Sequence, residues 1–107
     1  MHLCYTTVSS KEDATRLAKI AVESNLCACA QISSPIESIY QWKGEIQTDT
    51  EYRIVFKTLE SRLSELENAI NSAHPYETPQ WIAIKATKVS EKYLIWAKEV
   101  CTLRRLI

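Results

Sequence analysis

The side chains best suited to chemistry in this chain lie in one short segment, SAHPYETPQW, at residues 72–81. His74 carries an imidazole, which suits copper, zinc or nickel, and Glu77 adds a carboxylate three residues later. Two prolines bracket these residues and restrict the backbone around them. One imidazole and one carboxylate are a weak metal signal, so another interpretation stays open. In it, His74 lies beside the C-terminus of a helix, where the helix dipole favours it, and Tyr76 only packs.

The composition excludes several other chemistries. The chain has 107 residues, of which 46% are apolar and 24% charged, and its formal net charge is zero. Without a net charge it has no general attraction to nucleic acid or anionic membranes, so we expect neither as a partner. Its one glycine, Gly44, allows no glycine-rich phosphate loop. The segment TTVSSK lacks the paired thiols of a soft-metal chaperone, and His2 and His74 define no catalytic triad.

The cysteines indicate a reducing compartment. Cys27 and Cys29 would lie about 6.5 Å apart on one face of a strand, too far for a disulfide without distortion. The N-terminus lacks the basic segment and the long apolar stretch of an export signal. We therefore expect reduced, buried thiols and a cytoplasmic protein.

The elements that must position the 72–81 segment follow from the spacing of apolar residues. Strands are predicted at 2–8, 26–32, 36–42, 45–58 and 81–87, and helices at 10–25, at 59–73 and after Ser90. Ser9 and Glu12 fit a capping box for the first helix. This order predicts one α+β domain over residues 1–107. We expect a ferredoxin-like split β-α-β fold, with helices on one face of an antiparallel sheet.

The strands at 36–42 and 45–58 should form a long, projecting β-hairpin. Lys43-Gly44 is a turn signal, and apolar and polar residues alternate over about twelve residues of the second strand. Twelve extended residues span about 40 Å, whereas the radius of gyration of such a domain is about 13 Å. A projecting, half-apolar hairpin needs a cover, which predicts oligomerisation through it. A bulge or bend that breaks the strand is the alternative.

Together these features resemble the CutA divalent-cation tolerance family over almost the whole chain. The resemblance rests on Tyr40 and Trp42 before the turn, Glu51 and Lys57-Thr58 in the long strand, the H-P-Y-x-x-P loop at 74–79, and Tyr93 with Trp96. It implies a homotrimer similar to the PII signalling proteins, with no established catalytic activity. It also implies a role in tolerance of copper and other divalent metals.

The resemblance further implies a cleft at the subunit boundary, lined by the following side chains: His74, Tyr76, Glu77, Trp42 and Lys57. His74 matches the histidine of the family's loop. Ala73 and Thr6 stand where some members carry a second histidine and a cysteine. One imidazole binds a metal weakly, and a proton competes with it near pH 6.5. We therefore expect no obligatory cofactor, and binding of Cu(II) or another divalent metal through His74 and Glu77, with ligands pooled across subunits.

The expected function is that of a non-enzymatic homotrimer in divalent metal tolerance and response. The alternative is a PII-like trimeric sensor of a small anion or metabolite that acts through a protein partner. Lys57 would favour an anion in the cleft, whereas Glu77 would favour a cation. A third possibility is a scaffold whose trimer is itself the function.

Overall fold

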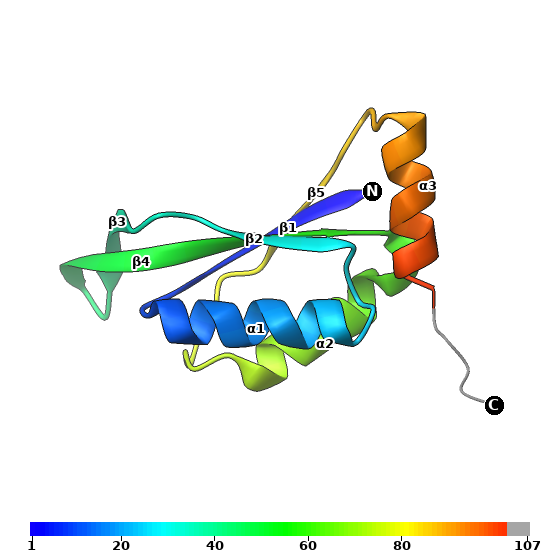
Figure 1. The fold of residues 1–107 in the computed structure, drawn as a ribbon. Coiled ribbons are helices and arrows are strands. Elements are labelled where there is room, and N and C mark those ends of the chain that lie inside the picture. Colours follow the sequence, from blue (N-terminus) through cyan, green and yellow to red (C-terminus); the bar gives the residue numbers. More distant parts are fainter. Residues whose placement is uncertain (103–107) are drawn as a thin grey trace.

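The structure, a computed structural model, describes residues 1–102 (Figure 1). Its elements are β1 (His2–Val8), α1 (Lys11–Glu23), β2 (Cys29–Ile32), β3 (Ile36–Trp42), β4 (Glu45–Thr58), a 3-10 turn (Glu60–Arg62), α2 (Leu63–Ala73), β5 (Ile82–Lys85) and α3 (Glu91–Val100). Every predicted strand and helix is present, with boundaries shifted by a few residues. No helix within the described residues is long and apolar enough to span a bilayer.

The main sheet has the strand order β2-β4-β1-β5, and each pair of neighbours is antiparallel. This order is the predicted ferredoxin-like arrangement, which is therefore confirmed. Helices α1 and α2 lie side by side against one face of the sheet (Figure 1). Helix α3 instead stands at the end of the sheet near the N-terminus, where Ala97 and Cys101 pack with Ala28 in a small cluster of their own.

The core forms between the sheet and the first two helices. Alternate residues of β1 and β4 point toward the helices, and the buried ones are Cys4, Val8, Ile54 and Phe56. The helices meet them with residues spaced one turn apart, namely Ala14, Leu17, Ala21, Leu66 and Ile70. Burial of these apolar side chains is the main contribution to the free energy that holds the sheet and the two helices together.

Both ends of α1 are closed by specific hydrogen bonds. At the start, Ser10 Oγ accepts a hydrogen bond from the Asp13 amide at 3.1 Å, so the cap lies one residue after the predicted Ser9–Glu12 box. At the end, Asn25 adopts the left-handed conformation (φ 58°), and the Leu26 amide donates to the Ala21 carbonyl. Because the chain must turn here, β2 begins at Cys29 rather than at residue 26.

The β3–β4 hairpin projects from the rest of the subunit, as predicted (Figure 1). Its strands pair from Ile36↔Glu51 to Trp42↔Glu45, and β4 then continues into the main sheet without interruption. The subunit measures 50 × 32 × 22 Å, with a radius of gyration of 14.8 Å, above the roughly 13 Å of a compact domain of this size. The alternative of a broken strand does not apply.

Candidate functional site

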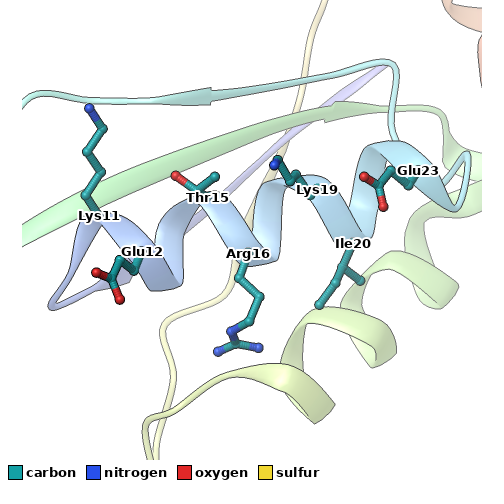
Figure 2. A pocket seen from close by; sticks show the side chains of 7 residues that line it. All are labelled: Lys11, Glu12, Thr15, Arg16, Lys19, Ile20 and Glu23. Atoms are coloured by element: carbon teal, nitrogen blue, oxygen red, sulfur yellow. The ribbon is translucent and has the colours of Figure 1, made fainter.

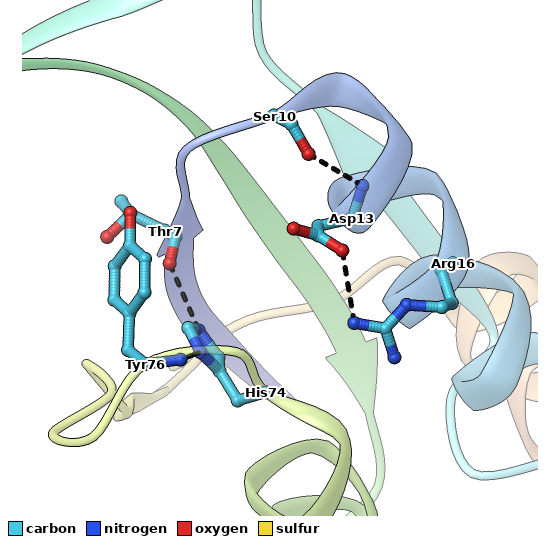
Figure 3. Close-up of polar contacts among 6 residues, drawn as sticks. All are labelled: Thr7, Ser10, Asp13, Arg16, His74 and Tyr76. Atoms are coloured by element: carbon cyan, nitrogen blue, oxygen red, sulfur yellow. Dashed lines mark hydrogen bonds and ion pairs between the residues drawn. The ribbon is translucent and has the colours of Figure 1, made fainter.

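The loop after α2 is fastened to the end of β1 by the imidazole of His74 (Figure 3). Because Pro75 follows, His74 is extended (φ −70°, ψ 137°), and α2 ends at the preceding residue. The ring Nδ1 accepts a hydrogen bond from the Tyr76 amide at 3.1 Å. The proton must therefore lie on Nε2, which donates to the carbonyl oxygen of Thr7 at 3.0 Å. Thr6 Oγ1 lies 3.0 Å from the same nitrogen and donates to the Gln80 carbonyl at 2.7 Å.

This arrangement leaves His74 no lone pair for a metal ion. One ring nitrogen accepts a hydrogen bond and the other donates one, so coordination would require breaking the bond from the Tyr76 amide. Burial lowers the pKa of His74 below its ordinary value of 6.5, and Arg16 adds to the effect, whereas the Thr7 carbonyl and Asp13 oppose it. His74 ends α2, as in the interpretation that placed it beside a helix C-terminus, but Tyr76 does more than pack, because its amide donates to His74 and its hydroxyl to Glu51.

Tyr76 connects the loop to the long strand. Its hydroxyl donates to Glu51 Oε2 at 2.7 Å, and burial, followed by this hydrogen bond, raises the pKa of Tyr76. Glu51 is only 8% exposed, and it lies where β4 passes from the hairpin to the main sheet. Within residues 1–102, Tyr76 is its only hydrogen-bond partner, and no lysine or arginine forms an ion pair with it. Among the described residues, the Glu51 carboxylate is therefore a buried group without a counter-ion.

A cleft of about 830 Å³ opens between the hairpin and this loop. The side chains that line it are Thr7, Ser9, Ser38, Ile39, Tyr40, Trp42, Asp49, Thr50, Glu51, Pro75, Tyr76, Glu77, Thr78 and Gln80. Three of the predicted site residues, Trp42, Tyr76 and Glu77, are brought together here. Lys57 is not among them, because its Nζ lies 5.8 Å from the ring centroid of Tyr93 in α3.

Two carboxylates of this cleft, Asp49 and Glu51, were not predicted as site residues. They lie two positions apart on one side of β4, and the Tyr40 hydroxyl donates to Asp49 across the hairpin. That hydrogen bond also raises the pKa of Tyr40. A signal was present in the sequence, since i and i+2 carboxylates in a strand share a face. The hairpin register, which pairs Tyr40 with Gln47, was needed to place Tyr40 diagonally across from Asp49.

A second surface depression runs along the outer side of α1 (Figure 2). Its side chains are Lys11, Glu12, Thr15, Arg16, Lys19, Ile20 and Glu23. They come from a single helix, mix both signs of charge and include no aromatic ring. We assign this surface no role in binding.

The remaining metal-ligating side chains form no site. Within residues 1–102, no three His, Cys, Asp or Glu side chains come together in a way that could hold one metal ion. The four cysteines are free thiols, and burial raises the pKa of Cys4 to about 11 and that of Cys27 to about 12. Thiols with so high a pKa are poor nucleophiles at neutral pH, which is consistent with a packing role for Cys4 and Cys27, whereas Cys29 is only partly buried, against the expectation of buried thiols.

The fold and the cleft define a class of protein: a small ferredoxin-like α+β domain with a projecting hairpin and an acidic, aromatic cleft at its base. The sequence profile of the CutA1 divalent ion tolerance protein family matches residues 2–100. The chain belongs to this family, so the resemblance seen in the sequence is confirmed.

Similar proteins occur in bacteria, archaea and plants. The divalent-cation tolerance protein CutA of Thermotoga maritima is 37% identical over 99 residues, which are 92% of this chain and 97% of that protein. The chloroplastic CutA of Arabidopsis thaliana is 40% identical over 88% of this chain, but the chain spans only about half (52%) of that relative. Among solved structures, CutA1 from Ehrlichia chaffeensis superposes with a TM-score of 0.91 at 39% identity, with 95% of each chain covered. The periplasmic CutA of Archaeoglobus fulgidus also superposes with a TM-score of 0.91, at 34% identity, with 95% of this chain and all of that chain covered.

Proposed function

We propose that this protein acts in divalent-cation tolerance as a homotrimer whose clefts bind cations. The observation that carries the proposal is Glu51, which is 8% exposed and has a single hydrogen bond and no counter-ion within the described residues. A buried carboxylate without a positive partner is energetically unfavourable, and a bound cation would compensate it. The family assignment supports the same conclusion.

The lining of the cleft favours a cation over an anion. Asp49, Glu51 and Glu77 contribute three carboxylates, while the described lining residues include no lysine, arginine or histidine. An anion would meet repulsion from these groups without an opposite charge to offset it. If the protein is a PII-like sensor that acts through a partner, as in the alternative function, we expect it to report a cation rather than a small anion.

For a metal ion, we propose the cleft carboxylates as ligands and no obligatory cofactor. Glu77 is exposed in the loop and remains the predicted ligand, whereas His74 would join it only if the loop released the Tyr76 amide. Cu(II) or another divalent metal would then bind weakly, because carboxylates alone do not match the imidazole sites that copper prefers.

We further propose that the protein is not an enzyme and that it works in the cytoplasm, although plant and archaeal relatives are named chloroplastic and periplasmic.

The homotrimer is supported by the apolar surface that one subunit leaves uncovered. On the hairpin, Ile39 and Ile46 are 67% and 71% exposed. On the sheet, Ile82 and Ile84 of β5 are each about half exposed, as is Ile95 on α3. Uncovered apolar surface of this extent in three separate places, the hairpin, β5 and α3, is typical of a protein that associates.

Two measurements test the proposal. Light scattering at micromolar concentration should give three times the subunit mass of 12.3 kDa, and a folded species of 12.3 kDa would contradict the proposed trimer.

Calorimetric titration with Cu(II) and Ca²⁺ should show binding that Glu51→Gln weakens and that Glu37→Gln does not. Glu37 serves as the matched control because it is an exposed hairpin carboxylate outside the cleft. Equal binding by both variants would contradict the cleft as the cation site.

A further inference from the structure

The carboxylates of the cleft are spread along it rather than gathered at one point. Asp49 and Glu51 share a side of β4 at positions i and i+2, which separates them by about 6.6 Å. Glu77 adds a third carboxylate from the loop. A tight metal site needs several oxygens within about 2.0–2.6 Å of a single centre, and no such group exists within residues 1–102, so a divalent metal would bind here only weakly. The spacing instead matches a ligand that carries several positive charges at intervals.

Each of the two strand carboxylates is paired with a tyrosine in the same way. The Tyr40 hydroxyl donates to Asp49, and the Tyr76 hydroxyl donates to Glu51 Oε2. Each bond orients one carboxylate and leaves its second oxygen able to accept from a ligand N–H group. The pairing therefore creates two similar places, each with an oriented carboxylate beside an aromatic ring. Such rings attract ammonium groups through their π faces.

Trp42 adds a third ring at the outer end of the cleft, and this ring already contacts an ammonium group. Lys43 Nζ lies 5.7 Å from the centroid of the indole. The methylene groups of an aliphatic chain would pack on the same aromatic surfaces. Carboxylates, aromatic rings and apolar surface are thus all available in the cleft to an alkyl chain with terminal ammonium groups.

The size and the charge of the molecule fit the same class of ligand. A volume of about 830 Å³ is in the range of sites for small organic molecules, about 300–1,000 Å³, and is far larger than a single ion needs. The net charge of the chain is zero, so a polycation would be attracted by the cleft and not by the protein as a whole.

We propose that the cleft binds an aliphatic di- or polyammonium cation. One ammonium group bonds to Asp49 and the next to Glu51, and the intervening methylene chain lies against Tyr40 and Tyr76. A four-carbon chain between two ammonium groups spans a distance similar to the roughly 6.6 Å between positions 49 and 51 along the strand. This inference rests on the proposed function, because it assigns a ligand class to the same cation-binding cleft.

Calorimetric titration at constant ionic strength tests the ligand class in the unmodified protein. We expect spermidine and 1,4-diaminobutane to bind at least about tenfold more tightly than propylamine, because they form a second ammonium–carboxylate bond that the monoamine cannot form. A diamine that binds no better than the monoamine overturns the inference. This comparison needs no variant, so it does not depend on a mutant folding.

Variants then locate the site. Asp49→Asn and Glu51→Gln each keep an oxygen for the tyrosine hydroxyl and remove one charge, and each should weaken diaminobutane binding about tenfold. Glu37→Gln, the control, should leave the affinity unchanged. Equal weakening by Glu37→Gln would overturn the inference by showing non-specific attraction.

The two proposals fail in different ways. If Cu(II) or Ca²⁺ binds and Glu51→Gln weakens that binding, but the amines do not bind, the ammonium ligand is wrong and the cation-binding function stands. If neither metal ions nor amines bind, both are wrong. Binding of the amines that depends on Asp49 and Glu51 supports both.

Discussion

At the scale of single residues, His74 holds the loop through a specific protonation state. Its Nδ1 must remain unprotonated to accept from the Tyr76 amide, so an added proton would face a donor at that position. The charged groups around the ring are Asp13 and Arg16 on α1, which form an ion pair at 3.2 Å, and Glu51 on β4. Their signs partly cancel, so burial is left as the main reason that the neutral ring is favoured.

This environment makes stability depend on pH. The pKa of His74 is lower in the folded protein than the 6.5 of an unfolded chain, so the unfolded state takes up the proton first. The contribution of neutral His74 to the free energy of unfolding is present in full above pH 6.5. It decreases as the pH falls from 6.5 toward the lower pKa of the folded state. We expect the thermal unfolding midpoint to fall between pH 7 and pH 5, and His74→Gln to flatten that decrease.

The His74→Gln variant should also be less stable at pH 8, by about 1–3 kcal/mol, because at least one hydrogen bond to the loop is lost. His2→Gln, which replaces the other histidine of the chain, is the comparison variant. If the unfolding midpoint of His74→Gln decreased between pH 7 and pH 5 as steeply as that of the original protein, groups other than His74 would govern the loss of stability in acid.

At the scale of elements, the hairpin turn depends on left-handed backbone conformations. Lys43 and Gly44 have φ values of 51° and 81°, the pattern of a two-residue type I′ turn. A Cβ at Gly44 would meet no atom within 4 Å, so any cost of adding one comes from the backbone and not from a clash. We expect Gly44→Ala to destabilise the hairpin by about 1–2 kcal/mol, measured as a decrease in the denaturant midpoint. No change would indicate that the turn relaxes into another type.

The C-terminal end of α1 depends on Asn25 in two separable ways. Its left-handed backbone closes the helix, and its side-chain Nδ2 donates to the carbonyl of Val100 at the end of α3, at 2.8 Å. Asn25→Gly keeps the first contribution and loses the second, whereas Asn25→Ala loses both. We expect Asn25→Ala to be less stable than Asn25→Gly by about 1 kcal/mol, measured by chemical denaturation. Equal stability would show that the conformation of residue 25 contributes nothing.

Most of the element pattern was readable from the sequence because it depends on local periodicity. The alternation in the second half of β4, with Ile54 and Phe56 buried, and the helical spacing of Leu66 and Ile70 reappear as buried faces, whereas the hairpin half of β4 stays exposed. The late start of β2 was not readable, because Leu26 is apolar but its amide closes α1. Only the folded chain shows which apolar residue belongs to a cap and which to a strand.

The site was predicted in part for a similar reason. Trp42, Tyr76 and Glu77 line the cleft, but Lys57 does not, because it lies six residues beyond Glu51 on an extended strand, about 20 Å away. That distance could have been worked out from the sequence. The role of His74 could not, since its partners at Thr6 and Thr7 are remote in the chain and are brought together by the fold.

At the scale of the whole molecule, the projecting hairpin is where assembly can be tested separately from folding. Ile46 is 71% exposed in the subunit, so a charge there costs the single chain little. Tyr52 is less suitable, because it already packs against the subunit's own core. We expect Ile46→Asp to yield a folded species with a smaller mass by light scattering and an unchanged far-ultraviolet circular dichroism spectrum.

The control for this experiment is Lys19→Glu, a charge change on the exposed surface of α1. It should leave the mass unchanged. A full-sized assembly with Ile46→Asp would exclude this part of the hairpin from the interface.

The uninterrupted course of β4 has a mechanical consequence. One strand of fourteen residues carries the hairpin tip at one end, the cleft carboxylates in its middle and the buried Phe56 at the other end. Its backbone cannot bend sharply without breaking ladder hydrogen bonds, to β3 alone in the hairpin and to β1 and β2 in the main sheet. We therefore expect β4 to move as one rigid segment that is anchored in the core. A ligand that shifts Asp49 and Glu51 would also displace the hairpin tip, and a contact that immobilises the tip would restrain these two carboxylates.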